Sequence, residues 1–174
     1  MIVGVLKYSS LNETQEDIGT IDLNEVLINI ETDLEVVINQ KNAVIKKDRL
    51  PSLEGASVLI YQLFYNLVNN SLKFCDEQPV ITISSTIEDR EGRKMAKIVV
   101  ADNGIGFDPV FAERIFDAFT RLNSKDKYEG TGLGLALCKK IVERHQGTIT
   151  ASGRENEGAV FTIYLPLVQA GKKV

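Results

Sequence analysis

Apolar residues recur at steps of three and four in three stretches of the chain, and this spacing predicts three amphipathic helices. The first covers residues 22–38, where Asp22 and Glu25 have the spacing of a capping box. The second covers residues 56–74 and ends before a proline-containing turn. The third begins among glycines and covers residues 132–145.

Short β-branched or alternating runs between the helices predict strands. The expected strands are a single one at 43–45, a hairpin of 80–87 with 97–101, and a closing hairpin of 148–151 with 159–165. Because hairpins dominate, the sheet should be mixed and mostly antiparallel. The predicted fold class is an α/β two-layer sandwich of about five strands with about three helices on one face, not a doubly wound fold.

Composition and charge narrow the class of protein. The chain has 174 residues, of which 44% are hydrophobic and 25% charged, so one medium-sized domain can bury a core. The net charge of −4 includes no basic excess, and we therefore expect no nucleic acid partner. No apolar run approaches the roughly 20 residues that span a bilayer, so we expect no direct membrane contact and a cytoplasmic location.

Cysteine and histidine are too few for a structural metal site. Cys75 and Cys138 form no CxxC pair, and His145 is the single histidine, which excludes zinc and disulfide scaffolds in practice. Both cysteines are expected to be small apolar fillers. His145 ends the third helix, where it would complement the helix dipole and needs no catalytic role.

A polar stripe on the second helix is the first candidate for chemistry. At about 100° per residue, Asn66, Asn70 and Lys73 fall within an arc of about 60° along the rim of the buried face. Amide oxygens are good ligands for a hard cation that carries phosphate, and a lysine can face phosphate as a point charge. Taken alone, the stripe is better explained as the solvent-exposed face of an amphipathic helix.

The run DNGIGF, residues 102–107, follows directly on the apolar strand 97–101. A carboxylate at a strand end, here Asp102, can accept a hydrogen bond from the exocyclic amine that adenine offers. Gly104 and Gly106 allow positive φ and a close approach of a flat ring to the backbone. An ordinary β-turn with an Asx-type cap explains the same residues about equally well.

The run GTGLGL, residues 130–135, opens the third helix. Free N–H groups at a glycine-rich helix start suit a polyphosphate. The glycines do not follow a strand, so this is no Rossmann fingerprint. No GxxxxGK run is present, so it is no Walker loop either. A plain helix start with glycines for close packing remains the alternative.

The segment between the two glycine motifs includes a predicted short helix at 110–116. Phe116 and Phe119 are three residues apart and would usually be core. The polar residues 123–129 could form a mobile cover over a bound ligand, and Arg121 is the cation best placed to reach phosphate.

Four motifs in this order resemble the boxes of sensor histidine kinases. QLFYNLVNNSLKF (62–74) is similar to the N box, DNGIGF to the G1 box, IFDAFTRL (115–122) to the F box, and GTGLGLALCKKIVERHQGTI (130–149) to the G2 box. GAVFTIYLP (158–166) resembles the family's closing strand. The resemblance covers residues 21–167 and is greatest to kinases of the phytochrome-associated type.

The resemblance implies an ATP-binding catalytic domain of the GHKL superfamily with the Bergerat fold, and ATP and Mg²⁺ as its ligands. By position, Asn70 would hold Mg²⁺, Asn66 would lie along the triphosphate, and Asp102 would bind the adenine amino group. Residues 123–129 would be the ATP lid. The other nucleotide-binding residues that it implies are Lys73, Phe74, Gly104, Gly106, Phe107, Arg121, Gly130, Thr131, Gly132, Leu133, Gly134 and Thr162.

The resemblance also implies how the chain divides. Residues 1–20 would be a junction containing the end of a dimerisation and phosphoacceptor helix, residues 21–167 the ATP-binding catalytic domain, and 168–174 a C-terminal tail. No histidine precedes His145, so the family's acceptor histidine is absent and we expect a catalytic domain cut from a longer kinase. Its implied partners are ATP, the histidine-bearing dimerisation domain of the parent kinase, and a response regulator receiver domain.

Two alternatives stay open. One is an ATPase or serine kinase of the same superfamily, although the F box and the closely spaced G2 box argue against topoisomerase-like relatives. The other is a nucleotide-dependent docking module, against which the full set of polar pocket positions argues.

Overall fold

The computed structural model describes residues 17–120, 122 and 131–170. The elements follow in the order β1 (Gly19–Asp22), α2 (Leu23–Asp33), α3 (Glu35–Gln40), β2 (Val44–Lys47), β3 (Ser52–Gly55), α4 (Ser57–Lys73), β4 (Val80–Arg90), β5 (Arg93–Asp102), the 3-10 helices η1 (Pro109–Phe111) and η2 (Arg114–Phe116), α5 (Gly134–Arg144), β6 (Thr148–Arg154) and β7 (Gly158–Pro166).

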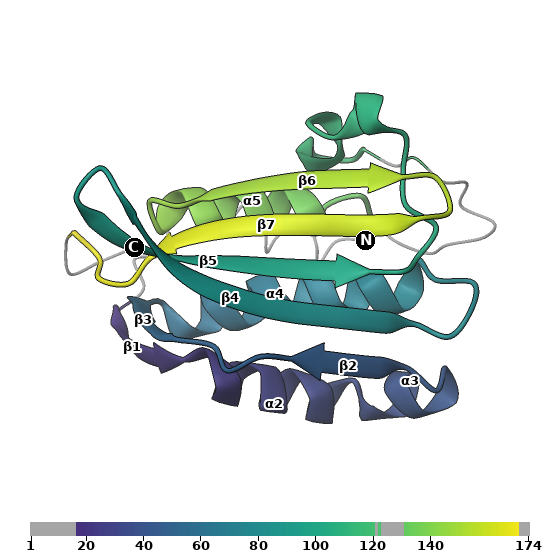
Figure 1. The fold of residues 1–174 in the computed structure, drawn as a ribbon, viewed down its shortest axis with the longest axis horizontal. Helices are drawn as coiled ribbons and strands as arrows, with labels where there is room; N and C mark the ends of the chain where they lie inside the picture. Colours follow the sequence, from purple (N-terminus) through teal and green to yellow (C-terminus); the bar gives the residue numbers. More distant parts are fainter. Residues whose placement is uncertain (1–16, 121, 123–130, 171–174) are drawn as a thin grey trace.

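Five strands form one mixed sheet in the order β2-β4-β5-β7-β6 (Figure 1). β2 lies parallel to β4, and the remaining neighbours are antiparallel. The two predicted hairpins close with Arg90 opposite Arg93 and with Arg154 opposite Gly158. The predicted mixed, mostly antiparallel sheet is confirmed.

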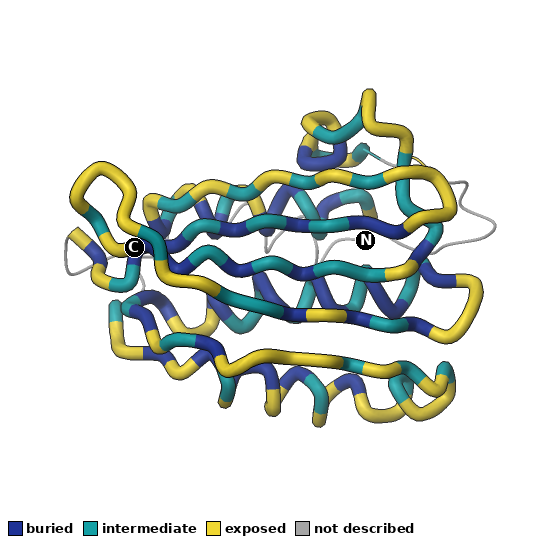
Figure 2. The backbone as a smooth tube through the Cα atoms, in the orientation of Figure 1, coloured by how far each residue is buried: buried dark blue, intermediate teal, exposed yellow. Residues whose placement is uncertain are grey.

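The helices cover one face of this sheet. In Figure 1 the viewer looks onto the open face, with α4 and α5 behind the strands and α2 along the β2 edge. Ile98 of β5 and Ile163 of β7 belong to the same apolar core as Phe64 and Leu67 of α4, and none of the four has exposed surface. Figure 2 shows buried positions gathered in the central strands and in the helices behind them. The predicted α/β two-layer sandwich is confirmed. Within the described residues, no helix combines the length and the apolar character needed to cross a bilayer.

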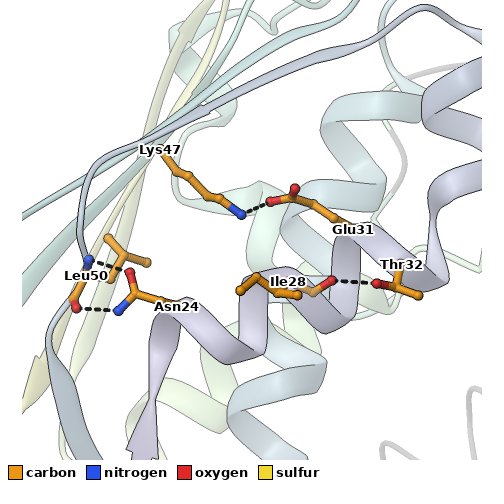
Figure 3. Close-up of polar contacts among 6 residues, drawn as sticks. All are labelled: Asn24, Ile28, Glu31, Thr32, Lys47 and Leu50. Carbon is orange, nitrogen blue, oxygen red and sulfur yellow. Dashed lines mark hydrogen bonds and ion pairs between the residues drawn. The ribbon is translucent and has the colours of Figure 1, made fainter.

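The predicted helix at 22–38 is interrupted. Asp22 caps α2 as expected, because its carboxylate accepts from the Asn24 N–H at 2.8 Å. A break at Leu34 then separates α2 from α3. Just before this break, the Thr32 hydroxyl donates to the Ile28 carbonyl at 3.0 Å (Figure 3). Such back-bonding competes with the helix ladder and often bends a helix.

Side-chain contacts hold α2 along the sheet edge (Figure 3). The Asn24 amide donates to the Leu50 carbonyl at 2.8 Å and accepts from the Leu50 N–H at 2.9 Å. Lys47 of β2 forms an ion pair with Glu31 of α2. Together these contacts fix α2 beside the segment from β2 to β3.

A second, two-stranded sheet has no counterpart in the sequence prediction. β1 pairs antiparallel with β3, and the Glu54 N–H of β3 donates to the Leu167 carbonyl at 2.9 Å. Each strand has four residues, too few for an alternating pattern to stand out. Gly19 and Thr20, which the sequence assigns to a polar junction, therefore belong to a strand.

The segment after β5 differs from expectation at one aromatic residue. Phe116 is buried and meets the Phe161 ring edge-on, with centroids 6.4 Å apart. The prediction that Phe119 is core is wrong, because this side chain is 64% exposed and its φ is +66°. η2 ends at Phe116 and Asp117 is extended, so helical spacing no longer keeps the two rings on one side.

The single histidine is a buried connector between two helices. His145 Nε2 accepts from the Ala56 N–H at 3.1 Å, and its Nδ1–H donates to the Ile141 carbonyl at 2.7 Å. This pairing requires the neutral ring, and burial lowers the pKa of the imidazole from 6.5. A structural role is confirmed. The predicted helix-dipole effect is wrong, because that effect requires a cation.

Stability is expected to fall as the pH drops below 6.5 because of this histidine. In the unfolded chain the imidazole takes up a proton near its ordinary pKa of 6.5, whereas the folded pKa of His145 is lower. The unfolded state therefore binds more protons in this window, and the free energy of unfolding decreases with the pH. Urea unfolding at several pH values measures the effect. His145→Gln should show a shallower decrease than the wild type. The same slope in both proteins would refute the assignment.

Candidate nucleotide-binding site

One cavity of about 330 Å³ lies where the C-terminal half of α4, the loop after β5 and the start of α5 meet. It collects residues from all three predicted motifs. The predicted residues that line it are Asn66, Asn70, Lys73, Phe74, Asp102, Gly106, Phe107, Thr131, Gly132 and Gly134. The fold thus brings together motifs that are far apart in the sequence.

Further lining residues are absent from the prediction, namely Asn69, Ile105, Ile115, Thr120, Leu122, Leu135, Ala159 and Phe161. Most are apolar, and in sequence an apolar pocket wall has the same pattern as core. Two carry a usable signal. Asn69 lies between two predicted amides, and Ile105 lies inside the DNGIGF loop.

Three predicted residues do not line the cavity. Gly104 lies behind Phe74, where an added Cβ would be 2.4 Å from the Phe74 carbonyl oxygen. Leu133 is buried, with 3% of its surface exposed. Thr162 alternates along β7 with Phe161, whose ring does line the cavity. Its side chain therefore points to the open face of the sheet, and we do not assign it to the site.

The remaining predictions in this region cannot be placed. Arg121, Gly130 and the expected lid, residues 123–129, lie outside the described residues. The same holds for the first 16 residues, where the end of a dimerisation helix is expected.

Asp102 is held at the end of β5 by three hydrogen bonds. Its Oδ1 accepts from the Gly104 N–H at 2.9 Å and from the Ala159 N–H at 3.2 Å, and its Oδ2 accepts from the Ser71 hydroxyl at 2.9 Å. A carboxylate oxygen offers about two acceptor positions. Oδ2 therefore keeps one position for a donor that enters the cavity.

The loop after Asp102 is shaped by close backbone approach. Gly106 has φ +61°, and a Cβ there would be 1.9 Å from the Arg154 carbonyl oxygen. The Ile105 N–H donates to the Phe74 carbonyl at 2.8 Å, and the Ile105 carbonyl accepts from the Asn156 N–H at 2.7 Å. The expected positive φ is found at Gly106 and not at Gly104. At Gly104 a glycine is required because the Phe74 carbonyl oxygen leaves no room for a Cβ.

The amides of α4 include a buried group without a partner. Asn66 Nδ2 has no hydrogen-bond partner among the residues that the structure describes. Beside it lies the Cys138 thiol, whose pKa burial raises to about 12 and which is a weak acceptor. A buried N–H without a partner costs about 1–3 kcal/mol. A ligand oxygen in the cavity would remove that cost. Both cysteines are free and buried, as predicted for fillers.

The start of α5 forms the third wall. Its N-cap residue, Leu133, supplies no side-chain hydrogen bond to the first turn. Gly132 has φ +72°, and Gly134 begins the helix with Asn70 Nδ2 4.0 Å from the position of an added Cβ. The positive end of the α5 helix dipole therefore lies beside Asn70 of α4.

Together, these groups fit a purine nucleoside triphosphate. Asp102 supplies an acceptor for an exocyclic amine, Phe107 an aromatic wall, Asn66 a donor in need of an acceptor, and α5 an anion site. The cavity lies between the helix layer and a mixed sheet, and this arrangement defines an ATP-binding domain with the Bergerat fold.

Comparisons with known proteins agree with this class. The chain belongs to the family described as "Histidine kinase-, DNA gyrase B-, and HSP90-like ATPase", whose model matches residues 55–169. Phytochrome-like protein Cph1 of Synechocystis sp. is 36% identical over 168 residues, which are 96% of this chain and 22% of Cph1. The chain thus spans about a fifth of the length of that relative. The resemblance to sensor histidine kinases is confirmed.

Solved structures show the same fold. The catalytic domain of the histidine kinase ThkA matches with a TM-score of 0.71 at 29% identity, over 87% of this chain and 99% of that one. Full-length ShkA, solved with AMPPNP, matches with a TM-score of 0.80 at 23% identity, over 98% of this chain and 36% of that one. The chain thus has the fold of the catalytic domains of histidine kinases.

Proposed function

We propose that the chain binds Mg-ATP in this cavity and transfers the γ-phosphoryl group to a histidine on a separate dimerisation domain of its parent kinase. The observation that carries the proposal is the cavity in which three features meet: Asp102, the Asn66 side-chain N–H that has no partner among the described residues, and the start of α5. Asp102 can accept a hydrogen bond from a purine amino group. The Asn66 N–H and the start of α5 can bind phosphate oxygens.

The residue roles follow from position. Asp102 accepts a hydrogen bond from the adenine amino group, and Phe74 and Phe107 border the base. Asn66 and Lys73 lie along the phosphates, and the first turn of α5 takes their terminal end. Lys73 Nζ is 4.4 Å from the centroid of the Phe74 ring, so these two side chains lie next to each other in the cavity wall. For Arg121, Gly130 and Thr131 the proposed role is phosphate contact.

The acceptor must come from outside the chain. The single histidine, His145, is fully buried, and both of its ring nitrogens are engaged in hydrogen bonds. In the transfer, an imidazole nitrogen of the acceptor attacks the γ-phosphorus with its own lone pair. The bond from that phosphorus to the bridging oxygen breaks, and ADP leaves. The domain contributes positioning and charge neutralisation.

Mg²⁺ would be held by the side-chain oxygen of Asn70 together with phosphate oxygens, and it would neutralise developing charge. Asn70→Ala is therefore expected to remove chiefly the metal-dependent part of nucleotide affinity. Calorimetry with ATP in excess Mg²⁺ and in excess EDTA measures that part, and we expect it to fall about tenfold.

Gln62→Ala is the matched control for this prediction, since Gln62 lies on the same helix but does not line the cavity. It should leave both affinities unchanged. The metal assignment would be refuted if Asn70→Ala and the wild type gained equally from Mg²⁺.

The proposed partners follow from the family. They are the histidine-bearing dimerisation domain and a response regulator receiver domain, and a solved complex joins the kinase ThkA to the response regulator TrrA. We place the domain in the cytoplasm, where ATP is available and where free cysteines persist. We also propose that residues 1–20 are a junction containing the end of the dimerisation helix, that 21–167 are the ATP-binding domain and that 168–174 form a C-terminal tail.

Labelled ATP tests the transfer. The chain is incubated with Mg-ATP labelled at the γ position and an isolated histidine-bearing hairpin of a related kinase. Label on the hairpin that survives base and is lost in acid supports phosphohistidine. Steady phosphate release without labelled protein would favour an ATPase, and acid-stable label would favour a serine kinase. No binding at millimolar Mg-ATP would favour a docking module.

A further inference from the structure

We infer that His145 is a positioning residue for the nucleotide site. Its hydrogen bond with Ala56 fixes the position of α5 along the axis of α4. The inference rests on the proposed function, since it concerns nucleotide affinity at the same cavity. His145 does not line the cavity. It lies at the far end of α4 and α5 from the cavity, to which both helices contribute residues.

The two helices lie antiparallel and in contact. At the cavity end, a Cβ on Gly134 would be 4.0 Å from Asn70 Nδ2. Farther along, the Cys138 thiol donates to the Leu63 carbonyl at 3.7 Å. Helices are stiff, with a rise of about 1.5 Å per residue. A displacement of α5 along α4 therefore shifts the anion-binding turn relative to the amide of Asn70 by the same distance along the helix axis.

Most of this interface is apolar, and its thiol hydrogen bond is weak. The bond from the Ala56 N–H to His145 Nε2 is directional and buried. It joins the N-cap residue of α4 to the C-cap residue of α5. Among the contacts described between these helices, it is therefore the one that best defines their displacement.

The imidazole itself has little freedom. Its Nδ1–H is bound to the Ile141 carbonyl, one turn earlier in α5. On the other side it packs on β3, where a Cβ on Gly55 would be 3.0 Å from the ring Cδ2 atom. Because the imidazole cannot move relative to α5, its hydrogen bond to Ala56 also sets the position of α5 relative to the start of α4.

Two neutral substitutions separate the two hydrogen bonds. The side chain of Gln can place an acceptor oxygen near the position of Nε2, so His145→Gln keeps the bond from Ala56. The shorter Asn can replace only Nδ1, so His145→Asn keeps the bond to Ile141 and loses the bond to α4. We expect His145→Asn to weaken Mg-ATP binding about tenfold, and His145→Gln to stay within about twofold of the wild type.

Calorimetry is done at a temperature at which circular dichroism shows every variant to be folded. Ile30→Val is the stability control, because it lowers stability from α2, which carries no cavity residue. It should leave the affinity unchanged. If His145→Asn does not fold, replacement of Ala56 by lactic acid, its α-hydroxy acid analogue, turns the N–H into an ester oxygen and removes the donor without adding atoms beside the imidazole. We expect the same tenfold loss.

A dissociation constant for His145→Asn equal to that of the wild type would overturn the inference. An equal loss in Ile30→Val would also overturn it, because the effect would then follow stability alone. Failure of the proposed function looks different, since the wild type itself would not bind Mg-ATP.

Discussion

Asp102→Asn is expected to weaken ATP binding by about 30- to 150-fold while the fold persists, which corresponds to about 2–3 kcal/mol. The Asn oxygen can still accept from Gly104 and Ala159, and its amide nitrogen can donate to the Ser71 hydroxyl, so the internal hydrogen bonds survive. Toward the cavity, however, a donor replaces an acceptor. It would face the adenine amino group, which is also a donor. Calorimetry with Mg-ATP measures the loss.

A matched control separates the hydrogen bond from the change in net charge. Asp89→Asn makes the same chemical change near the end of β4, where the Asp89 carboxylate accepts from the Gly92 N–H. It should bind ATP like the wild type. Asp102→Asn should in addition lose part of its preference for ATP over GTP. Equal ATP affinity in Asp102→Asn and the wild type would contradict the adenine assignment.

Gly106→Ala is expected to lower the free energy of unfolding by about 2–5 kcal/mol and to abolish tight ATP binding. The positive φ costs an L-residue about 1–2 kcal/mol, and crowding in a packed region adds about 1–3 kcal/mol. The new Cβ would lie 1.9 Å from the Arg154 carbonyl oxygen, so the loop must move away from the β6–β7 turn. Urea unfolding and calorimetry measure the two effects.

Gly92→Ala is the control for backbone strain. Gly92 has φ +77°, but no atom lies within 4 Å of the position of an added Cβ. In this variant the free energy of unfolding should therefore fall only by the cost of the positive φ, and the ATP affinity should be unchanged. If both variants lost the same stability and bound ATP equally well, close packing of the Gly106 loop would not shape the site.

The sequence predicts the sheet and the long helices well because each has a local signal. α4 and α5 carry apolar residues at helical spacing over 17 and 11 residues. The β4–β5 hairpin combines a polar turn with two long β-rich strands. The short pair β1 and β3 lacks such a signal, and so does the break at Leu34, beside which the Thr32 hydroxyl donates to the Ile28 carbonyl.

The candidate site divides in the same way. Asp102, Asn70 and the glycines are polar or conformationally special residues in hydrophobic surroundings, and this contrast marks them in sequence. Ala159 and Phe161 are typical core residues, and only the pairing of β7 with β5 places them beside the cavity. Thr162 is the opposite case, a polar residue that the sequence favours for the site. It follows Phe161 directly, and its side chain points to the other face of the sheet because side chains alternate along a strand.

The role of His145 depends on tertiary contact. Its place in the last turn of α5 suggests an interaction with the helix end. The partner that matters, Ala56, is 89 residues away in sequence. Sequence spacing alone contains no information about that pair, whereas the buried location and the two engaged nitrogens define it in the structure.

Nuclear magnetic resonance with Mg-ATP tests the central claim most directly. The side-chain amides of Asn66 and Asn70 and the backbone amides of Gly106, Gly132 and Gly134 can be followed in one titration. We expect these signals to shift together and to saturate at one nucleotide per chain, while Thr162 and its neighbours on the open face of the sheet do not move. Shifts that appear on the open face and spare the cavity would contradict the account.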